Sequence, residues 1–168
     1  VLEPKPDQQG NMKFSLALLI PKSRSAELDP LRQAALTVAK DWWGDKGAAI
    51  LANQKYALIK DGDSIKDSEG KLKPENKGMF VISMRTDRKP GVLDAQKNPV
   101  FSDDEVYSGC LLRVTGAVFG YDVTGNRGVS FGLGNVQVLR KGARFDGRKA
   151  AEEEFEEWVD PEGADPLA

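Results

Sequence analysis

The most regular hydrophobic pattern in the chain is an alternation of apolar and polar residues close to its N-terminus. Every second side chain of residues 12–20 is apolar, and Pro21 follows. Alternation with a period of two places one face of a strand on a core, and proline interrupts a strand ladder. The pattern predicts a β-strand over residues 12–20. Residues 1–11, rich in proline, glutamine and charge, are expected to form an extended lead-in.

A helical period follows this strand. Asp29 can cap a helix that begins at Pro30, Gly44 can end it, and the apolar positions on one face are Leu31, Ala35, Val38 and Trp42. Trp42 and Trp43 could stack on nucleobases, but tryptophans at the end of an amphipathic helix more often pack that helix on a sheet. We expect packing.

The rest of the chain is predicted to be mainly strands. Strands are expected over 56–60, 79–85, 107–123 and 129–140, with a long polar loop over 61–77. The run T-G-N-R-G at 124–128 is typical of a hairpin turn, because glycine and asparagine accept positive φ. A short helix is expected over 148–158, followed by a disordered end.

The strand expected over 107–123 divides into two chemically different faces. At a period of two, one face is apolar and consists of Cys110, Leu112, Val114 and Val118. The other face carries aromatic and basic side chains, namely Tyr107, Arg113, Phe119 and Tyr121. Glycines within this segment permit the bends or bulges that a strongly curved barrel strand needs, although a bulge would shift the phase.

Charge is distributed unevenly along the chain. The whole protein has a net charge of −2, but residues 151–168 contain eight acidic residues and no lysine or arginine. Residues 1–150 therefore hold 18 acids against 24 bases, a net charge of +6. A basic body is typical of proteins that bind a polyanion, and an acidic tail is often an interaction segment or a competitor for the same basic surface.

Several enzyme classes are disfavoured by what the sequence lacks. There is no histidine to act as a general base, so the serine-elbow pattern around Ser130 cannot form a triad. No phosphate-cradling glycine run occurs, and the Asp61–Asp63–Asp67 spacing fails the calcium-loop pattern. Cys110 is expected to be a buried hydrophobe. We predict no catalytic residue, metal or cofactor, with a magnesium-dependent nuclease using Asp103, Asp104 and Glu105 as a minor alternative.

Aromatic side chains among lysines and arginines fit the needs of sequence-tolerant binding to single strands, since rings stack on bases and cations hold phosphates. The expected stacking residues are Phe80, Tyr107, Phe119 and Tyr121. The expected phosphate contacts are Lys73, Lys77, Arg85, Arg88, Arg113 and Arg127. Phe80 is in phase with Ile82 and Met84, so a position in the core is an equal alternative.

Three segments carry a resemblance to a known family. They are Tyr107-Ser-Gly-Cys, the run T-G-N-R-G-V-S-F-G-L-G-N-V-Q from residue 124, and the acidic F-E-E-W end. With the opening strand that ends in I-P-K and the helix that ends in W-W, the chain resembles phage-encoded single-stranded DNA-binding proteins over residues 12–158, a family long known only as a domain of unknown function. The resemblance implies an OB-fold, little sequence preference, no catalytic residues and a role in phage replication or recombination.

These observations predict a mainly β protein, an OB-fold type β-barrel with one or two helices and an acidic C-terminal tail. The expected divisions are a lead-in at 1–11, a DNA-binding domain at 12–147, and a short helix with acidic tail at 148–168. The expected partners are single-stranded DNA and, through the tail, phage or host replication and recombination proteins. No apolar run is long enough to span a membrane, so a cytoplasmic location is expected. A protein-interaction module without nucleic-acid binding remains the alternative.

Overall fold

The computed structural model describes residues 2–149 and 154–157. In chain order its strands are β1 Lys5–Pro6, β2 Met12–Pro21, β3 Ile59–Asp61, β4 Met79–Thr86, β5 Val92–Leu93, β6 Leu111–Val123 and β7 Asn126–Arg140. The two α-helices of this part of the chain are α1 Asp29–Trp43 and α2 Gly47–Asn53. Short 3-10 helices span Lys22–Leu28, Gly44–Lys46, Gly62–Ser64 and Pro74–Asn76.

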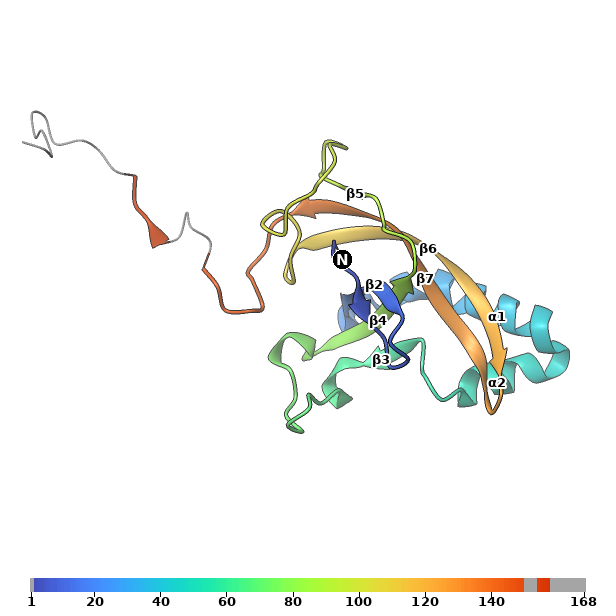
Figure 1. Cartoon of the computed structure of the whole chain (residues 1–168). Coiled ribbons are helices and arrows are strands. Elements are labelled where there is room, and N and C mark those ends of the chain that lie inside the picture. Colours follow the sequence, from blue (N-terminus) through green and yellow to red (C-terminus); the bar gives the residue numbers. More distant parts are fainter. Residues whose placement is uncertain (1, 150–153, 158–168) are drawn as a thin grey trace, which may run out of the picture.

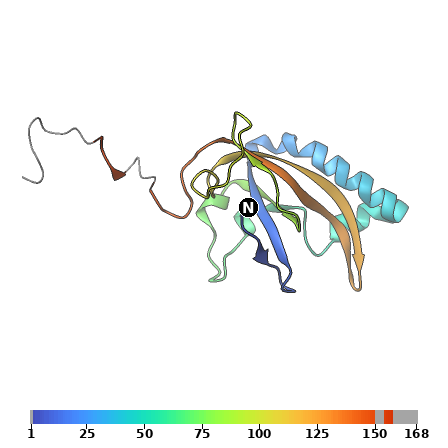
Figure 2. The ribbon, with the colours of Figure 1, turned by 45° about the horizontal axis from the view of Figure 1, so that its top comes forward.

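The strands form a single curled sheet of OB type (Figure 1). β2 lies antiparallel between β1 and β4, and β3 also pairs with β4. β7 is central, since it contacts β4 and β5 in parallel and β6 in antiparallel pairing. The long β6–β7 hairpin curves away from β2, with α1 running along it (Figure 2). The expectation of a mainly β barrel with helices is confirmed.

The core lies inside the curl of the sheet. Its buried side chains come from the 3-10 helix before α1, from β4, β5 and β7, and from the loop before β6. They are Leu28, Ile82, Met84, Val92, Val100, Val106, Phe131, Leu133, Val136 and Val138. Alternate residues of β2 pack against this cluster. Burying such side chains is the main favourable term in folding and fixes which face of each strand points outward.

β6 has the two faces expected from the sequence. Leu112, Val114 and Val118 pack against the core, whereas Arg113 and Phe119 are exposed. A bulge interrupts the pairing with β7, because Val114 pairs with Val136 but Gly116 pairs with Leu133. The extra residue lies on β7, so the phase of β6 is preserved. The strand begins at Leu111, and the expectation that it begins at residue 107 is wrong.

The helix expected after the first strand is confirmed as α1, but its start differs. Asp29 is the first helical residue rather than the cap, because a 3-10 helix leads directly into it, and its carboxylate pairs with Arg32. Trp43 packs with Ala35, Ala39 and Val129 in a second cluster. Trp42 lies against Gly120 of β6 but remains 53% exposed, so of the two tryptophans only Trp43 packs as expected.

Other boundaries moved by a few residues. The strand expected at 56–60 is β3, Ile59–Asp61, and the strand expected at 79–85 is β4. The turn of the hairpin is confined to residues 124 and 125, with Gly125 at φ 76°, and β7 already begins at Asn126. Of the helix expected at 148–158, the described residues 148, 149 and 155–157 are not helical, whereas residues 150–153 and 158 and the end after them lie outside the described residues.

Candidate nucleic-acid interface

The outer face of the sheet is hollowed into a groove of about 830 Å³. Residues 7–9, β2, β4 and the segment 56–58 form one side, and the hairpin of β6 and β7 forms the other. We call this hollow the sheet groove. Strands far apart in sequence meet here because β4 lies between β2 and β7.

Small side chains line the floor of the sheet groove. Ser83 of β4 and Ser130 and Gly132 of β7 are among its lining residues. Ser130 pairs with Phe119, and Gly132 pairs with Ala117, so both point to the outer face together with Phe119. A floor of this kind lets a flat ligand approach the backbone of the sheet closely.

Three aromatic rings border the sheet groove. Phe119 and Tyr121 are two residues apart on the outer face of β6, and Tyr56 comes from the segment between α2 and β3. Phe119 is 47% exposed and Tyr56 is 48% exposed, values that leave ring surface available for stacking. Partial burial, and to a smaller extent the neighbouring Tyr56, raises the pKa of the Tyr121 hydroxyl.

Three cations and two carboxylates, Asp7 and Asp87, also line the groove. Lys13 comes from β2, Lys60 from β3 and Arg85 from β4. Lys13 forms an ion pair with Asp87, a pair exposed enough to exchange for a phosphate. Within the described part of the chain neither Lys60 nor Arg85 has an ion-pair partner. The groove therefore combines stacking surfaces with a small excess of positive charge.

Gln54 holds the aromatic border in place. Its side-chain amide accepts a hydrogen bond from Val129 N at 2.9 Å and donates to Val129 O at 3.0 Å, as a neighbouring strand would. It also donates to the carbonyl of Tyr56. The segment after α2 is thereby fastened to β7, which positions Tyr56 opposite the tip of the hairpin.

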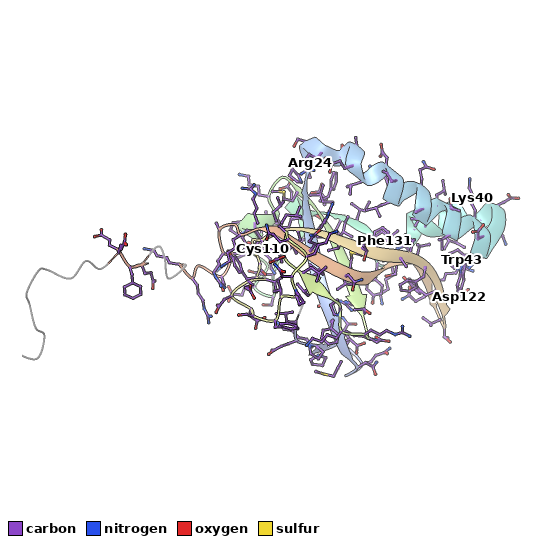
Figure 3. The ribbon with its side chains drawn as sticks, turned by 90° about the horizontal axis from the view of Figure 1, so that it is seen from above. Arg24, Lys40, Trp43, Cys110, Asp122 and Phe131 are labelled. Carbon is purple, nitrogen blue, oxygen red and sulfur yellow. The ribbon has the colours of Figure 1, made fainter. Side chains whose placement is uncertain are left out.

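A smaller hollow of about 490 Å³ lies between α2 and the tip of the β6–β7 hairpin. Its lining includes Lys46, Lys55 and Arg127 as well as Asn126, which also lines the sheet groove. We call it the tip notch. The hairpin tip and the helices lie at the same end of the molecule, where Figure 3 labels Trp43 and Asp122.

The structure brings together only some of the residues singled out in the sequence. Arg85, Phe119 and Tyr121 line the sheet groove, and Arg127 lines the tip notch. The remaining four cations line neither hollow: Lys73, Lys77 and Arg88 lie exposed on loops, and Arg113 on β6 donates a hydrogen bond to Gln137 at 2.8 Å.

Phe80 and Tyr107 lie away from the sheet groove. Phe80 packs against the core, with the cations of Lys22 and Arg32 about 6 Å from its ring centre. Tyr107 lies under the Arg144 guanidinium at 4.0 Å and donates its hydroxyl proton to the carbonyl of Gly142. Both rings therefore have intramolecular partners that fix local structure.

Sequence reasoning missed Lys13, Tyr56 and Lys60. The run of Lys55, Tyr56 and Lys60 places an aromatic ring among lysines, a signal that could have drawn attention to this segment. Lys13 gave no such signal, because only the pairing of β2 with β4 brings it to the groove.

Two further features bear on function. Among the described residues no group of three or more carboxylates, cysteines or histidines is arranged to hold a metal ion, and this includes the acidic run at residues 103–105. No helix in the described part of the chain is long and apolar enough to cross a membrane.

Solved structures define the class of protein to which this fold belongs. The single-stranded DNA-binding protein of bacteriophage Enc34, solved in complex with single-stranded DNA, matches with a TM-score of 0.65 and 25% identity over 85% of this chain and 80% of that one. The single-stranded DNA-binding protein gp2.5 of bacteriophage T7 matches with a TM-score of 0.55 and 13% identity, over 95% and 88% of the two chains. The T7 likeness concerns the fold alone.

Sequence comparison identifies the family. The family model described as the single-stranded DNA-binding protein of Enterobacter phage Enc34 matches residues 1–165. Protein p50 of Acyrthosiphon pisum secondary endosymbiont phage 1 is 33% identical over 156 residues, which are 89% of this chain and 81% of p50. The chain belongs to the Enc34 family of single-stranded DNA-binding proteins. This membership confirms the family expected from the sequence, and with it a protein that is not an enzyme.

Proposed function

We propose that this protein binds single-stranded DNA in the sheet groove, with little sequence preference and without chemical change to the DNA. The observation that carries the proposal is the meeting of three aromatic rings with Lys13, Lys60 and Arg85 around a floor of small residues. Membership of the Enc34 family supports the same function. These are the two components of sequence-tolerant binding, stacking platforms and a positive track.

Bases stack on Phe119, Tyr121 and Tyr56, and the phosphates between them lie near Lys60 and Arg85. Every base has a π face, so stacking accepts any sequence. Duplex DNA binds less tightly, because its paired bases are stacked on one another and cannot reach the rings. Magnesium is not required, since binding alone involves no bond cleavage.

The other cations extend this track outward. Lys73, Lys77 and Arg88 supply long-range attraction from loops, and Arg113 contacts a phosphate beyond the groove on the same strand as Phe119. Phe80 and Tyr107 are the weakest candidates for stacking, because both rings already have cationic neighbours within the protein. Their replacement would test local stability more than affinity.

The experiment is a comparison of two double variants with the wild-type protein. Replacing Arg85 by Gln and Tyr121 by Ala removes one cation and one ring from the groove. The control replaces Arg140 by Gln and Phe101 by Ala, both exposed and outside both hollows. Stacking is worth about 1–3 kcal/mol for each base, so the first variant is expected to lose at least tenfold in affinity. An unchanged affinity, or equal losses in both variants, would contradict the groove as the site.

The biological role that we propose is protection of single-stranded DNA during phage DNA replication, recombination or repair, in the cytoplasm of the bacterial host. The acidic residues after 150 compete for the groove or recruit replication proteins. Deleting residues 151–168 should tighten DNA binding at low salt if competition operates. If affinity does not change, recruitment of replication proteins or solubility is the remaining role of the tail.

A further inference from the structure

The tip notch is a concentration of positive charge. Lys46 precedes α2, Lys55 follows it, and Arg127 projects from the hairpin tip. All three residues are exposed, and none of the residues lining the notch is acidic. Asp122 is the strand partner of Arg127 but forms no ion pair with it within the described residues.

The tip notch continues directly from the sheet groove. Asn126 lines both hollows, and Lys55 in the notch is adjacent to Tyr56 in the groove. The Lys55 ammonium group lies 5.1 Å from the centre of the Tyr56 ring, so a cation stands at the boundary between them. Gln54, which lines the notch, fastens this boundary to β7 through two hydrogen bonds with Val129. The two hollows therefore keep a fixed relation to each other.

We infer that the tip notch is a second phosphate-binding segment, which takes the DNA strand out of the sheet groove and around the hairpin tip. Lys46, Lys55 and Arg127 bind its phosphates. The inference rests on the proposed function of the groove and extends it. With the tip notch included, the protein binds a longer stretch of DNA than the sheet groove alone can hold. Short strands fill the groove, and longer strands also occupy the notch.

The test measures affinity against DNA length. Oligothymidines stepped between about 4 and 16 nucleotides, the range of site sizes known for OB-folds, are titrated at several salt concentrations. The test variant is K46Q/K55Q/R127Q of the full chain. The control is K40Q/K71Q/K97Q, three exposed lysines on separate elements that line neither hollow. Thermal unfolding of each variant verifies the fold.

The test variant should bind the shortest oligonucleotides as the wild type does but lose the affinity that the wild type gains with length. On the longest strand its salt slope should fall by about 2, since each phosphate on single strands contributes roughly 0.7. The control should keep the wild-type length dependence. The inference would be overturned if the test variant bound every length as the wild type does. It would also be overturned if the variant lost the same affinity at all lengths, or if the control lost as much. None of these results would contradict binding of DNA in the sheet groove. Absence of wild-type binding would overturn the proposed function as well.

Discussion

The ring of Phe119 on β6 lies against Gly132 of β7, so close that a β-carbon added to Gly132 would be 3.4 Å from Phe119 Cε1. The two residues are diagonal neighbours on the outer face, since Phe119 pairs with Ser130 and Gly132 pairs with Ala117. Any side chain larger than that of alanine at residue 132 must push the ring aside or rise into the sheet groove. Glycine at residue 132 therefore leaves the Phe119 ring accessible to a base in the sheet groove.

Replacing Gly132 by Val is expected to weaken binding of single-stranded DNA by about tenfold, because one stacked base contributes roughly 1–3 kcal/mol. The free energy of unfolding should change by less than about 1 kcal/mol, since valine is favoured in strands. Affinity for an oligothymidine and chemical unfolding measure the two effects. Gly132→Ala is the matched control and should bind nearly as the wild type does. Full affinity of the valine variant would show that bases do not stack beside Phe119.

Replacing Gln54 by Ala is expected to destabilise the protein by about 1–3 kcal/mol, because both the N–H and the carbonyl of Val129 lose their partners in a partly buried place. Chemical unfolding measures the loss. Asn53→Ala serves as control, since the Asn53 side chain bonds only to the carbonyl of Ala49 one turn earlier. DNA affinity should fall in the Gln54 variant too, because Tyr56 is no longer held. Equal stability of the two variants would show that the hydrogen bonds between Gln54 and Val129 do not stabilise the fold.

The turn at residues 61–64 should respond to acid. Asp63 accepts hydrogen bonds from Lys22 Nζ at 2.7 Å and from Gly78 N at 2.9 Å, and these lower its pKa below 3.8, with Lys22 the larger cause. Since the pKa in the folded state lies below that of the unfolded chain, this contribution to stability is present above pH 3.8. It is lost as the pH falls through the folded-state pKa.

The Gly78 amide reports this titration in an NMR experiment. Its chemical shift should titrate with a midpoint below pH 3.8. In Asp63→Asn the acid-dependent change should disappear, while the rest of the spectrum is retained. A midpoint at or above pH 3.8 would contradict the contact between Asp63 and its two donors.

Much of this molecule follows from local sequence patterns. The period of two in β2 and β4 and the helical period of α1 were sufficient to predict three elements, because each buries one face. The two faces of β6 were predicted for the same reason, and they put Phe119 and Tyr121 on the outer surface. The extra residue of the bulge lies on β7, so the alternation of faces along β6 is preserved although the strand contains glycines.

The rest depends on contacts that local patterns do not encode. α2 has seven residues, too few for a clear helical period, and it was not predicted. The sheet groove is assembled from β2, β3, β4 and the hairpin, so Lys13 and Lys60 join it only through strand order. Tyr107 lies before the strand and not on it, because β6 begins at Leu111. Its ring packs under Arg144 instead.

The central claim, that single strands bind in a groove of rings and cations, is tested most directly by titrating the protein with fluorescent single-stranded and double-stranded oligonucleotides of equal length. Several salt concentrations are needed, each with and without magnesium. We expect tight binding to the single strand, weaker binding to the duplex, no cleavage, and affinity that falls with salt at roughly 0.7 per phosphate contacted. Failure to bind single strands, or equal affinity for the duplex, would contradict the account.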